Sequence, residues 1–439
     1  MARAPDAARP RVPVSLARAR FPPAVLRVLT ALDRAGHPSW IVGGAVRDLL
    51  LRRPAPDFDL ATPATPQEVT DLFRRVVPTG VDHGTVTVLE GDEKIEVTTF
   101  RGEGAYLDGR RPGSVTFHRD LDADLARRDF TMNALAFDPL RGEFRDPFGG
   151  RADLRRRLIR AVGDPAERFA EDGLRAMRAV RFAAQLGYGL DRRTRAAIPG
   201  TLDVVARVSP ERIADELGKL LLARSAARGL ELMRATGLLA VVLPELDRLP
   251  GRALRHALRL VARVRPDPVL RWAALLHGRS PEEAEGILVR LRLPRRLAED
   301  VRALLRGHGC VLGRAAPLPA GPVEVRRWLA AVGPGRAPAL LELASAEAGE
   351  LPPSRARRRA AAVRRLRADV ERVRASGAAL TAQGLALDGR GVMEVLGTGP
   401  GPQVGEALRH LLDQVLADPG LNERDRLADA LRRWWEARL

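Results

Sequence analysis

Hydrophobic and polar residues alternate with two different periods along the chain, and the change of period divides the chain in two. A helical period runs through Ala24–Ala35, and a short apolar run follows at Trp40–Val42. Residues 77–100 alternate in two arms around Gly91-Asp92, which predicts a β-hairpin. From Arg151 onward the period of two disappears and the helical period dominates. The pattern predicts an α+β fold, with helices flanking a small mixed sheet in an N-terminal head and only helices after it.

The stretch Ile41–Thr62 combines a glycine turn with two aspartates. Its sequence, IVGGAVRDLLLRRPAPDFDLAT, predicts a strand, a tight turn at Gly43 and Gly44, a short helix and a second strand. Glycines let a phosphate approach bare backbone N–H groups, and the N-terminus of the following helix favours an anion. Arg47 lies one turn into that helix, where its guanidinium can hold a phosphate oxygen.

The second strand carries a pair of carboxylates. Side chains alternate between the faces of a strand, so Asp57 and Asp59 point the same way while Phe58 packs behind them. Two adjacent carboxylates repel each other unless a cation lies between them, and hard divalent metals prefer oxygen ligands. A glycine pair alone is more often an ordinary turn, and a lone DxD is more often a solvated strand end. Their combination within 22 residues favours nucleotidyl or phosphoryl transfer.

This combination resembles the bacterial class of tRNA nucleotidyltransferases, the CCA-adding enzymes, and their poly(A) polymerase relatives. The resemblance implies a polymerase-β-like nucleotidyltransferase head and a template-independent enzyme that adds C and A, or A alone, to the 3′ end of tRNA. CTP and ATP would be the substrates, pyrophosphate would leave, and Asp57 and Asp59 would be the catalytic residues that hold Mg²⁺. A bacterial poly(A) polymerase is the alternative within this class. A catalytically inactive RNA-binding protein is the alternative outside it, and the intact aspartate pair argues against that alternative.

A second resembling motif is LARRDFTMNALAF, residues 125–137. Asp129 and Asn133 are four residues apart, so they are expected to share a helix face. A carboxylate such as Asp129 can accept a hydrogen bond from a ribose 2′-hydroxyl, which would favour NTP over dNTP. Taken alone, Arg127, Arg128 and Asp129 are better interpreted as a solvated charge cluster, but together with the first motif they favour a nucleotide-binding role.

A predicted neck helix, Glu171–Gly187, carries a row of charged residues at every third position. Structurally, such a row could be a ladder of ion pairs on a solvated face, whereas the resemblance favours a nucleotide-binding site. Cytosine and adenine each present an exocyclic amine beside an unprotonated ring nitrogen, which Asp172 and Arg175 can pair with; uracil and guanine present the reverse pattern. The predicted members of the row are Asp172, Arg175, Arg178 and Arg181, of which Arg181 lies almost opposite Asp172.

Two further features of the head have less specific patterns. Glu96 shares a strand face with Thr98, and it is expected to be either a third carboxylate near the aspartate pair or an ordinary surface residue. The segment that follows, residues 101–117, is rich in Gly and Arg, and this composition predicts a mobile loop. It resembles the flexible loop of the family at Asp108, Arg110 and Arg111.

The helical remainder contains one stretch, Leu270–Ser280, that resembles a metal-dependent HD phosphohydrolase domain. The resemblance fails at the decisive position, because His277 is followed by Gly278 rather than by aspartate. We therefore interpret this region as helical scaffold, with His256 and His308 as packed or surface residues.

The C-terminal part is interpreted as a surface for RNA. Arg355–Arg374 is predicted to be an arginine-rich helix, which suits a nucleic-acid backbone although such runs are often only solvated. Leu385–Leu412 resembles the family's tail, in which a helix, a glycine turn and a second helix grip RNA.

Composition supports a polyanionic partner. The chain has 439 residues, enough for two to four domains, and its formal charge of +18 favours nucleic acid. Its single cysteine, Cys310, excludes an internal disulfide and a cysteine-rich metal site. No apolar run approaches the length of a membrane span.

The predicted organisation has five parts and an RNA substrate. The expected partners are tRNA, CTP and ATP, with no membrane and no protein partner inferred, and the resemblance implies a cytoplasmic enzyme. The parts are a disordered basic tail at 1–22, a nucleotidyltransferase head at 23–150, a base-selecting neck at 151–215, a degenerate HD-like helical body at 216–320 and a tRNA-binding helical tail at 321–439.

Overall fold

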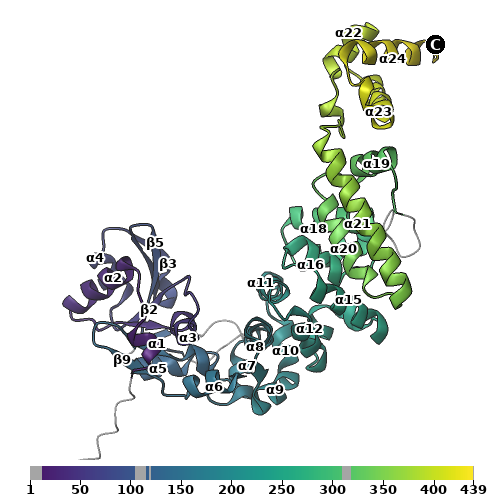
Figure 1. Ribbon diagram of the computed structural model, residues 1–439. Coiled ribbons are helices and arrows are strands. Elements are labelled where there is room, and N and C mark those ends of the chain that lie inside the picture. The colour runs from purple at the N-terminus through teal and green to yellow at the C-terminus, as the bar shows by residue number, and fades with distance from the viewer. Residues whose placement is uncertain (1–11, 104–114, 118–119, 309–317, 439) are drawn as a thin grey trace, which may run out of the picture. The chain divides into compact units, whose positions relative to one another are not determined.

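The computed structural model describes residues 12–103, 115–117, 120–308 and 318–438 of the chain (Figure 1). Contacts divide the chain into two compact units, Met1–Arg248 and Leu249–Leu439. The first unit contains a seven-stranded mixed sheet followed by helices, and the second contains helices in its described part. The predicted α+β class is therefore confirmed.

The sheet has the strand order β3-β4-β5-β2-β1-β8-β9. Only β2 and β5 pair in parallel among these neighbours, and the other pairs are antiparallel. Its strands are β1 (Trp40–Val42), β2 (Asp59–Thr62), β3 (Val76–Gly80), β4 (Thr85–Glu90), β5 (Glu93–Thr99), β8 (Ala136–Asp138) and β9 (Glu143–Arg145). The register pairs Glu90 with Glu93, which confirms the hairpin predicted around Gly91-Asp92.

Helices cover both faces of this sheet because its central strands are hydrophobic on both sides. Trp40 and Val42 of β1 belong to a buried cluster with Leu121 and Leu125 on one face. On the other face, α2 and α4 pack against β4. The helices of the head are α1 (Val14–Ala17), α2 (Pro23–Arg34), α3 (Gly44–Leu50), α4 (Pro66–Leu72), α5 (Leu121–Ala126) and α6 (Gly150–Arg156).

Three local predictions in the head are wrong. Residues 12–22 are not part of a disordered tail, because they include α1, whose Leu16 is buried, and Phe21, whose ring stacks on Phe137 at 5.9 Å between centroids. The segment 101–117 is not all loop, since β6 (Arg101–Glu103) pairs with β7 (Val115–Phe117). Asp129 and Asn133 do not share an α-helix face, because α5 ends at Ala126 and only a 3-10 turn, Thr131–Asn133, follows.

The neck also differs from the predicted continuous helix. Two helices replace it, α7 (Pro165–Glu171) and α8 (Leu174–Leu186). Asp172 and Gly173 form the break between them. A short parallel pair, β10 (Leu158–Ile159) with β11 (Gly189–Leu190), interrupts the helical region that was predicted to lack strands. The remaining helices of this unit are α9 (Arg192–Ala197), α10 (Leu202–Ala206), α11 (Pro210–Leu221), α12 (Ala226–Ala235), α13 (Leu238–Val242) and α14 (Pro244–Asp247).

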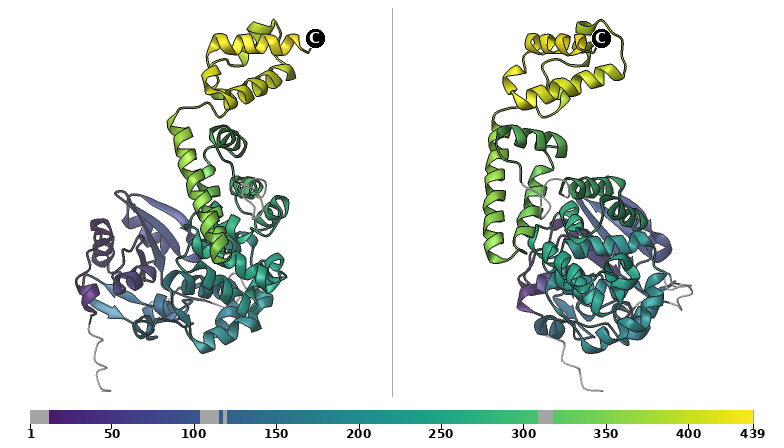
Figure 2. Two further views of the ribbon diagram at one scale, coloured as in Figure 1. Left: turned by 45° about the vertical axis from the view of Figure 1, so that its right-hand side comes forward. Right: turned by 90° about the vertical axis from the view of Figure 1, so that its right-hand side faces the viewer.

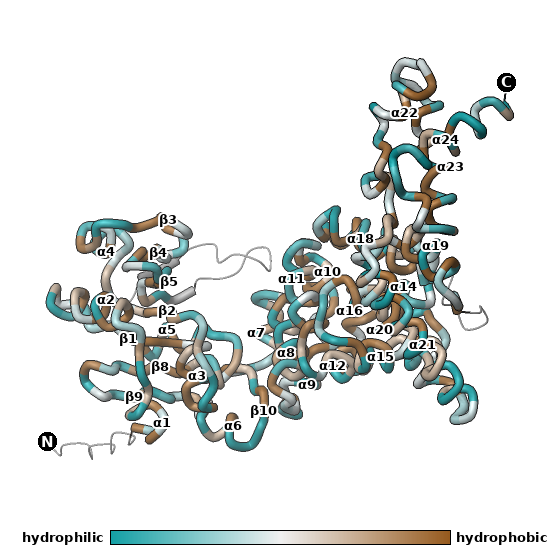
Figure 3. The backbone as a smooth tube through the Cα atoms, turned by 45° about the horizontal axis from the view of Figure 1, so that its top comes forward, coloured by the Kyte–Doolittle hydropathy of each residue, from teal (hydrophilic) through white to brown (hydrophobic). Residues whose placement is uncertain are grey.

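The second unit is a bundle that leads into a smaller terminal group of helices. The bundle consists of α15 (Gly251–Arg263), α16 (Pro268–Leu275), α17 (Pro281–Arg290), α18 (Arg295–Gly307), α19 (Pro322–Val332), α20 (Ala337–Ala348) and α21 (Pro353–Ala375). Hydrophobic segments recur along its inner helices, for example α16 and α20 (Figure 3).

Helix α21 is the long helix that leads towards the C-terminus (Figure 2). It buries one apolar stripe, Val363, Leu366, Val370 and Val373, and most of its arginines are exposed. Beyond it, α22 (Gly389–Leu396), α23 (Pro402–Ala417) and α24 (Arg424–Glu436) share one core. The predicted helix–glycine turn–helix element is present as α22, residues 397–401 and α23.

Candidate active site

A cavity of about 370 Å³ opens in the first unit, where the head sheet meets the neck. Six arginines and three aspartates line it, so its lining carries an excess of positive charge that suits a polyanionic ligand such as a triphosphate. The lining residues are Gly43, Gly44, Arg47, Asp59, Arg127, Arg128, Asp129, Asn133, Asp172, Leu174, Arg175, Arg178, Phe182 and Arg212.

The glycine turn forms one wall of the cavity. Gly43 has a φ of +71°, which disfavours residues with a side chain, and a Cβ there would lie 2.9 Å from Nη1 of Arg128. Arg47 follows in α3 and donates from Nη1 to Oδ1 of Asn133 at 2.8 Å. Asp48 accepts two further hydrogen bonds from Arg47, at 3.0 and 2.9 Å, and so fixes the direction of the guanidinium.

The carboxylates of the head gather at the edge of the cavity. The alternation predicted for this strand is present: Asp57 and Asp59 are exposed, and Phe58 between them is buried. The register of β2 with β5 pairs Leu60 with Val97, which places Glu96 beside Asp59. The Asp59 side chain is reached by solvent at the cavity, but protein groups surround the rest of it. Removal from bulk water therefore raises the pKa of Asp59, repulsion by Glu96 and Asp57 raises it further, and Arg128 opposes the rise.

Asp129 is held from three directions. Its Oδ1 accepts hydrogen bonds from the backbone N–H of Phe130 at 2.8 Å and from Asn133 at 2.9 Å. Its Oδ2 accepts from Nε of Arg178 at 2.8 Å. Burial alone would raise the pKa of Asp129, but the charge of Arg178 and these hydrogen bonds hold it below its ordinary value. The contact between Asp129 and Asn133 was predicted from a shared helix face and arises instead from the turn that follows α5.

Asp172 and Arg175 both line the cavity, yet each is bound to a different partner. Oδ2 of Asp172 accepts from Nη2 of Arg212 at 2.7 Å, and its Oδ1 accepts from the N–H of Leu174 at 3.0 Å. Arg175 donates from Nη1 to Glu171 at 2.6 Å and from Nη2 to the carbonyl of Arg127 at 3.2 Å. The two side chains are therefore positioned separately, as two functional groups on one wall.

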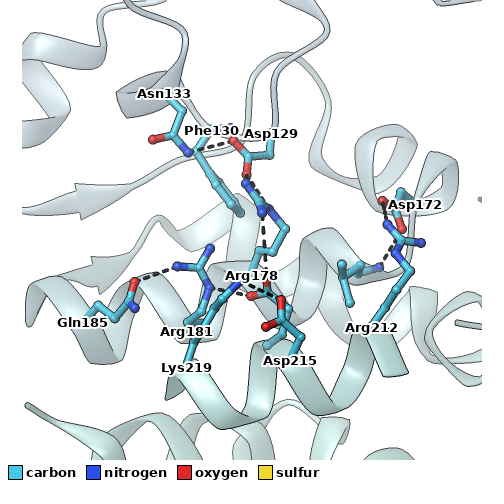
Figure 4. A network of polar contacts seen from close by, with 12 residues as sticks. Asp129, Phe130, Asn133, Asp172, Arg178, Arg181, Gln185, Arg212, Asp215 and Lys219 are labelled. Carbon is cyan, nitrogen blue, oxygen red and sulfur yellow. Dashed lines mark hydrogen bonds and ion pairs between the residues drawn. The ribbon is translucent and has the colours of Figure 1, made fainter. Parts of the chain in front are cut away.

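Arg178 and Arg181 differ in position although both were predicted to bind nucleotide. Arg178 reaches from α8 to Asp129 and lines the cavity (Figure 4). The negative charge of Asp129 raises the pKa of Arg178. Arg181 is not among the lining residues; it donates to Glu216 and to Gln185. Glu216 also lies 3.6 Å from Arg178, so Arg181 supports Arg178 through that carboxylate.

The structure brings most of the predicted site residues together. Gly44, Arg47, Asp59, Asp129, Asp172, Arg175 and Arg178 line one cavity, and Asp57 and Glu96 lie beside Asp59. Asp108, Arg110 and Arg111 lie outside the described residues.

Three contributions were not identified from the sequence. Arg128 faces the glycine turn and Asp59, and Asp124 holds both Arg127 and Arg128 by ion pairs of 2.9 and 3.2 Å. Arg212 binds Asp172 from α11, forty positions along the chain. The adjacent arginines before Asp129 were a usable signal for the first of these, whereas no local pattern marks Arg212.

Two families match parts of the chain. Residues 39–160 match the Poly A polymerase head domain. Residues 187–249 match a family described as a probable RNA and SrmB-binding site of polymerase A.

Relatives that span more of the chain are CCA-adding enzymes. The chain is 38% identical to the CCA-adding enzyme of Geobacillus stearothermophilus over 410 residues, which cover 92% of this chain and 94% of that protein. It is 45% identical to the enzyme of Geobacillus thermodenitrificans over 285 residues, 64% of this chain and 69% of that protein. The crystal structure of the Bacillus stearothermophilus CCA-adding enzyme in complex with CTP superposes with a TM-score of 0.78 at 36% identity, over 95% of this chain and 99% of that one.

Proposed function

The chain belongs to the CCA-adding enzymes, a family of template-independent tRNA nucleotidyltransferases, and we propose that it carries out this reaction in the cavity described above. The 3′ hydroxyl of tRNA attacks the α-phosphate of CTP or ATP, and pyrophosphate leaves. One observation carries the proposal: Asp59, with two acidic neighbours, lies at the edge of an arginine-lined cavity beside a glycine turn.

The arginines of the cavity have complementary tasks in this proposal. The turn at Gly44 and the guanidinium of Arg47 bind the phosphates, because backbone N–H groups at a helix start and a fixed cation both favour anions. Arg128 faces the same turn and adds a second cation beside Asp59. These contacts orient the triphosphate with its α-phosphate toward the carboxylates.

Nucleotidyltransferases of this kind are metal-dependent, and we propose Mg²⁺ as the ion. The donor set fits, because Asp57 and Glu96 both raise the pKa of Asp59 and three neighbouring carboxylates offer the oxygen ligands that a hard divalent cation prefers. Asp57 and Asp59 would hold the ion, with Glu96 as the third carboxylate. An ion held there would supply Lewis-acid chemistry, which activates a hydroxyl for attack and neutralises charge on a leaving oxygen.

The neck and the remaining helices complete the proposal. Asp172 accepts from the exocyclic amine of C or A, and Arg175 donates to the adjacent ring nitrogen. The exposed arginines of α21 and the glycine turn before α23 bind the tRNA backbone. In this proposal the head catalyses, the neck selects the base, and the body and tail bind tRNA. A cytoplasmic location follows from the tRNA substrate. In the described part of the chain, no helix is long and apolar enough to span a membrane.

One experiment tests the proposal directly. The full chain is incubated with tRNA ending in its discriminator base, or in CC, with CTP and ATP supplied separately. Addition of CC followed by A supports the proposal, and addition of A only onto tRNA ending in CC identifies an A-adding enzyme. Untemplated runs of A on any RNA would identify a poly(A) polymerase, which has less support because relatives over most of the chain are CCA-adding enzymes. Binding of tRNA without any addition would identify an inactive RNA-binding protein.

Sugar selection gives the first prediction. Asp129→Ala should reduce the preference for CTP over dCTP by about 10- to 100-fold, the worth of one hydrogen bond to a charged acceptor. The measurement is kcat/KM for CTP and dCTP. Asp215→Ala is the matched control, since this aspartate lies on α11 beside the same network and is exposed (Figure 4). An unchanged ratio of kcat/KM for CTP to that for dCTP in Asp129→Ala would mean that Asp129 does not bind the ribose hydroxyl.

Glu96 gives the second prediction, through the pH dependence of stability. The pKa of Asp59 is higher in the folded chain than the ordinary value of 3.8 for an aspartate. Its contribution to stability is therefore present at acid pH and is lost as pH rises through the folded pKa. Glu96→Gln removes the second largest cause of this rise, so the metal-free variant should unfold at a higher temperature than wild type at pH 7.5 and not at pH 4.

The measurement is thermal unfolding at both pH values, in EDTA and in Mg²⁺. Mg²⁺ should stabilise wild type more than Glu96→Gln, because the ion relieves the same repulsion. Glu93→Gln, at the exposed start of β5, is the control. Equal stability curves for Glu96→Gln and Glu93→Gln would make Glu96 an ordinary surface residue.

A further inference from the structure

Three of the seven histidines of the chain meet around a buried glutamate in the second unit, far in sequence from the proposed active site. His256 belongs to α15, His277 follows α16 and His308 follows α18, while Glu347 lies near the end of α20. We refer to these four residues as the histidine cluster. Helices α15, α16, α18 and α20 pack against one another, so the cluster lies where separate segments converge.

The spacing within the cluster approaches that of metal ligands. One ligand atom from each of His256, His277 and Glu347 lies within 4.8 Å of the others. Nε2 of His308 lies 3.3 Å from Oε2 of Glu347, and Nε2 of His277 lies 3.7 Å from Oε1. Ligands bound about 2.1 Å from a tetrahedral ion are about 3.4 Å apart, so His277 and His308 already lie near ligand separation from Glu347.

The chemistry of the cluster also points to a cation. Glu347 and His308 are each only 4% exposed, so this carboxylate and this imidazole face each other away from bulk water. Nε2 of His308 is buried without a hydrogen-bond partner, although it faces the carboxylate. An imidazole nitrogen that faces acidic and imidazole ligands in this way is suited to donate its lone pair to a metal.

The surroundings supply support and access. Glu350, which forms ion pairs with Arg259 and Arg263, lies 3.8 Å from Nδ1 of His256. A carboxylate in that place orients a metal-bound imidazole that binds through its other nitrogen. His256 and Glu350 also line a cavity of about 410 Å³, which gives an ion a route to the cluster.

We propose that the histidine cluster binds one divalent ion of the zinc class. Three imidazoles and one carboxylate are donors that Zn²⁺ accepts in four-coordinate sites, and they disfavour Mg²⁺ and Ca²⁺, which prefer oxygen ligands. Four protein ligands fill a tetrahedral shell, so the ion serves to join four helices. It replaces the HD-type site that Gly278 makes incomplete, because the carboxylate comes from Glu347 instead. The inference does not depend on the proposed reaction.

Metal binding to the purified full-length chain tests the inference. The protein is prepared without a histidine tag and carries Asp57→Asn and Asp59→Asn, so that the head does not contribute a second site. It is stripped with a chelator and titrated with Zn²⁺ or Co²⁺. We expect one ion per chain, a visible Co²⁺ spectrum typical of four-coordination, and a higher unfolding temperature with Zn²⁺ but not with Mg²⁺.

Variants of the cluster should lose this binding. Glu347→Gln and His256→Gln should each weaken Zn²⁺ affinity by about 100-fold or more, since loss of an outer-shell partner alone costs 10- to 100-fold. His410→Gln, a histidine of α23 stacked on Trp434, is the matched control and should leave affinity unchanged. If Glu347→Gln fails to fold, the Zn²⁺ affinity of His256→Gln tests the proposal, because His256 is only half-buried. No bound ion in the parent protein, or equal affinity in His256→Gln and His410→Gln, would overturn the proposal.

Discussion

Nucleotide addition is expected to fall by at least about 10³-fold when either Asp57 or Asp59 is replaced by asparagine, because several kcal/mol of transition-state stabilisation depend on the metal that we propose they hold. Asparagine keeps the size of the side chain and removes its charge. Folding should survive the change, since both side chains are exposed and the buried Phe58 between them is untouched. In Asp57→Asn, loss of a repelling neighbour should also lower the pKa of Asp59 towards its ordinary value.

Single-turnover incorporation of CTP onto tRNA lacking its CCA end measures this effect. Binding of tRNA is followed in parallel and should change little, because the variants alter only the proposed metal site. Asp92→Asn, at the tip of the hairpin on the same sheet, is the matched control and should retain full activity. A rate above about a tenth of wild type in either variant would mean that the metal is held elsewhere.

Local patterns predicted the head because its site is built from neighbouring residues in the chain. Alternation around Phe58 places two carboxylates on one side of a strand, and the glycine turn precedes α3 directly. Thr65 and Glu68, three residues apart, form a capping box at the start of α4. In each case the physical cause lies within a few residues, so the sequence displays it.

The neck was predicted less well because distant contacts shape it. A Cβ on Gly173 would lie 2.7 Å from backbone atoms of Val204 and Val205, so the chain passes too close for a side chain at the break between α7 and α8. The periodicity of Glu171–Gly187 contains no trace of that contact. Arg212 escaped prediction for the same reason, since it reaches Asp172 only after α11 folds back.

The histidine cluster could not be predicted from the sequence either, because its members come from separate helices. Gly278 removes the local signature of a metal site, and the sequence was interpreted there as scaffold. The carboxylate that faces His277 comes from Glu347, seventy positions later, and only the packing of α16 against α20 brings them together. Spacing along the chain cannot reveal a ligand set assembled from separate helices.

Arg175→Ala should relax base selection, with the preference for CTP over UTP falling by about 10- to 100-fold, the cost of leaving one buried polar group unpaired. Arg175 is 7% exposed at the cavity wall, and Glu171 holds it at 2.6 Å, so its donors have a fixed direction. A fixed donor pairs with the bare ring nitrogen of C or A and opposes the ring N–H of U or G. Removing it eliminates the penalty against the wrong bases and part of the affinity for the right ones.

Steady-state kinetics with all four NTPs show whether Arg175 recognises the base or only stabilises the neck. If Arg175 reads the base, kcat/KM falls for CTP and ATP and rises relative to them for UTP and GTP. If it only stabilises the neck, the four values fall in proportion and the selectivity profile is unchanged, which would end the base-reading hypothesis. Arg207→Ala is the matched control, an exposed arginine after α10 that pairs with Asp203 outside the cavity. Glu171→Gln tests whether the position of Arg175 matters as well as its charge. This variant keeps the arginine but weakens the contact that fixes it. Selectivity should fall, because discrimination depends on the direction of the Arg175 donors.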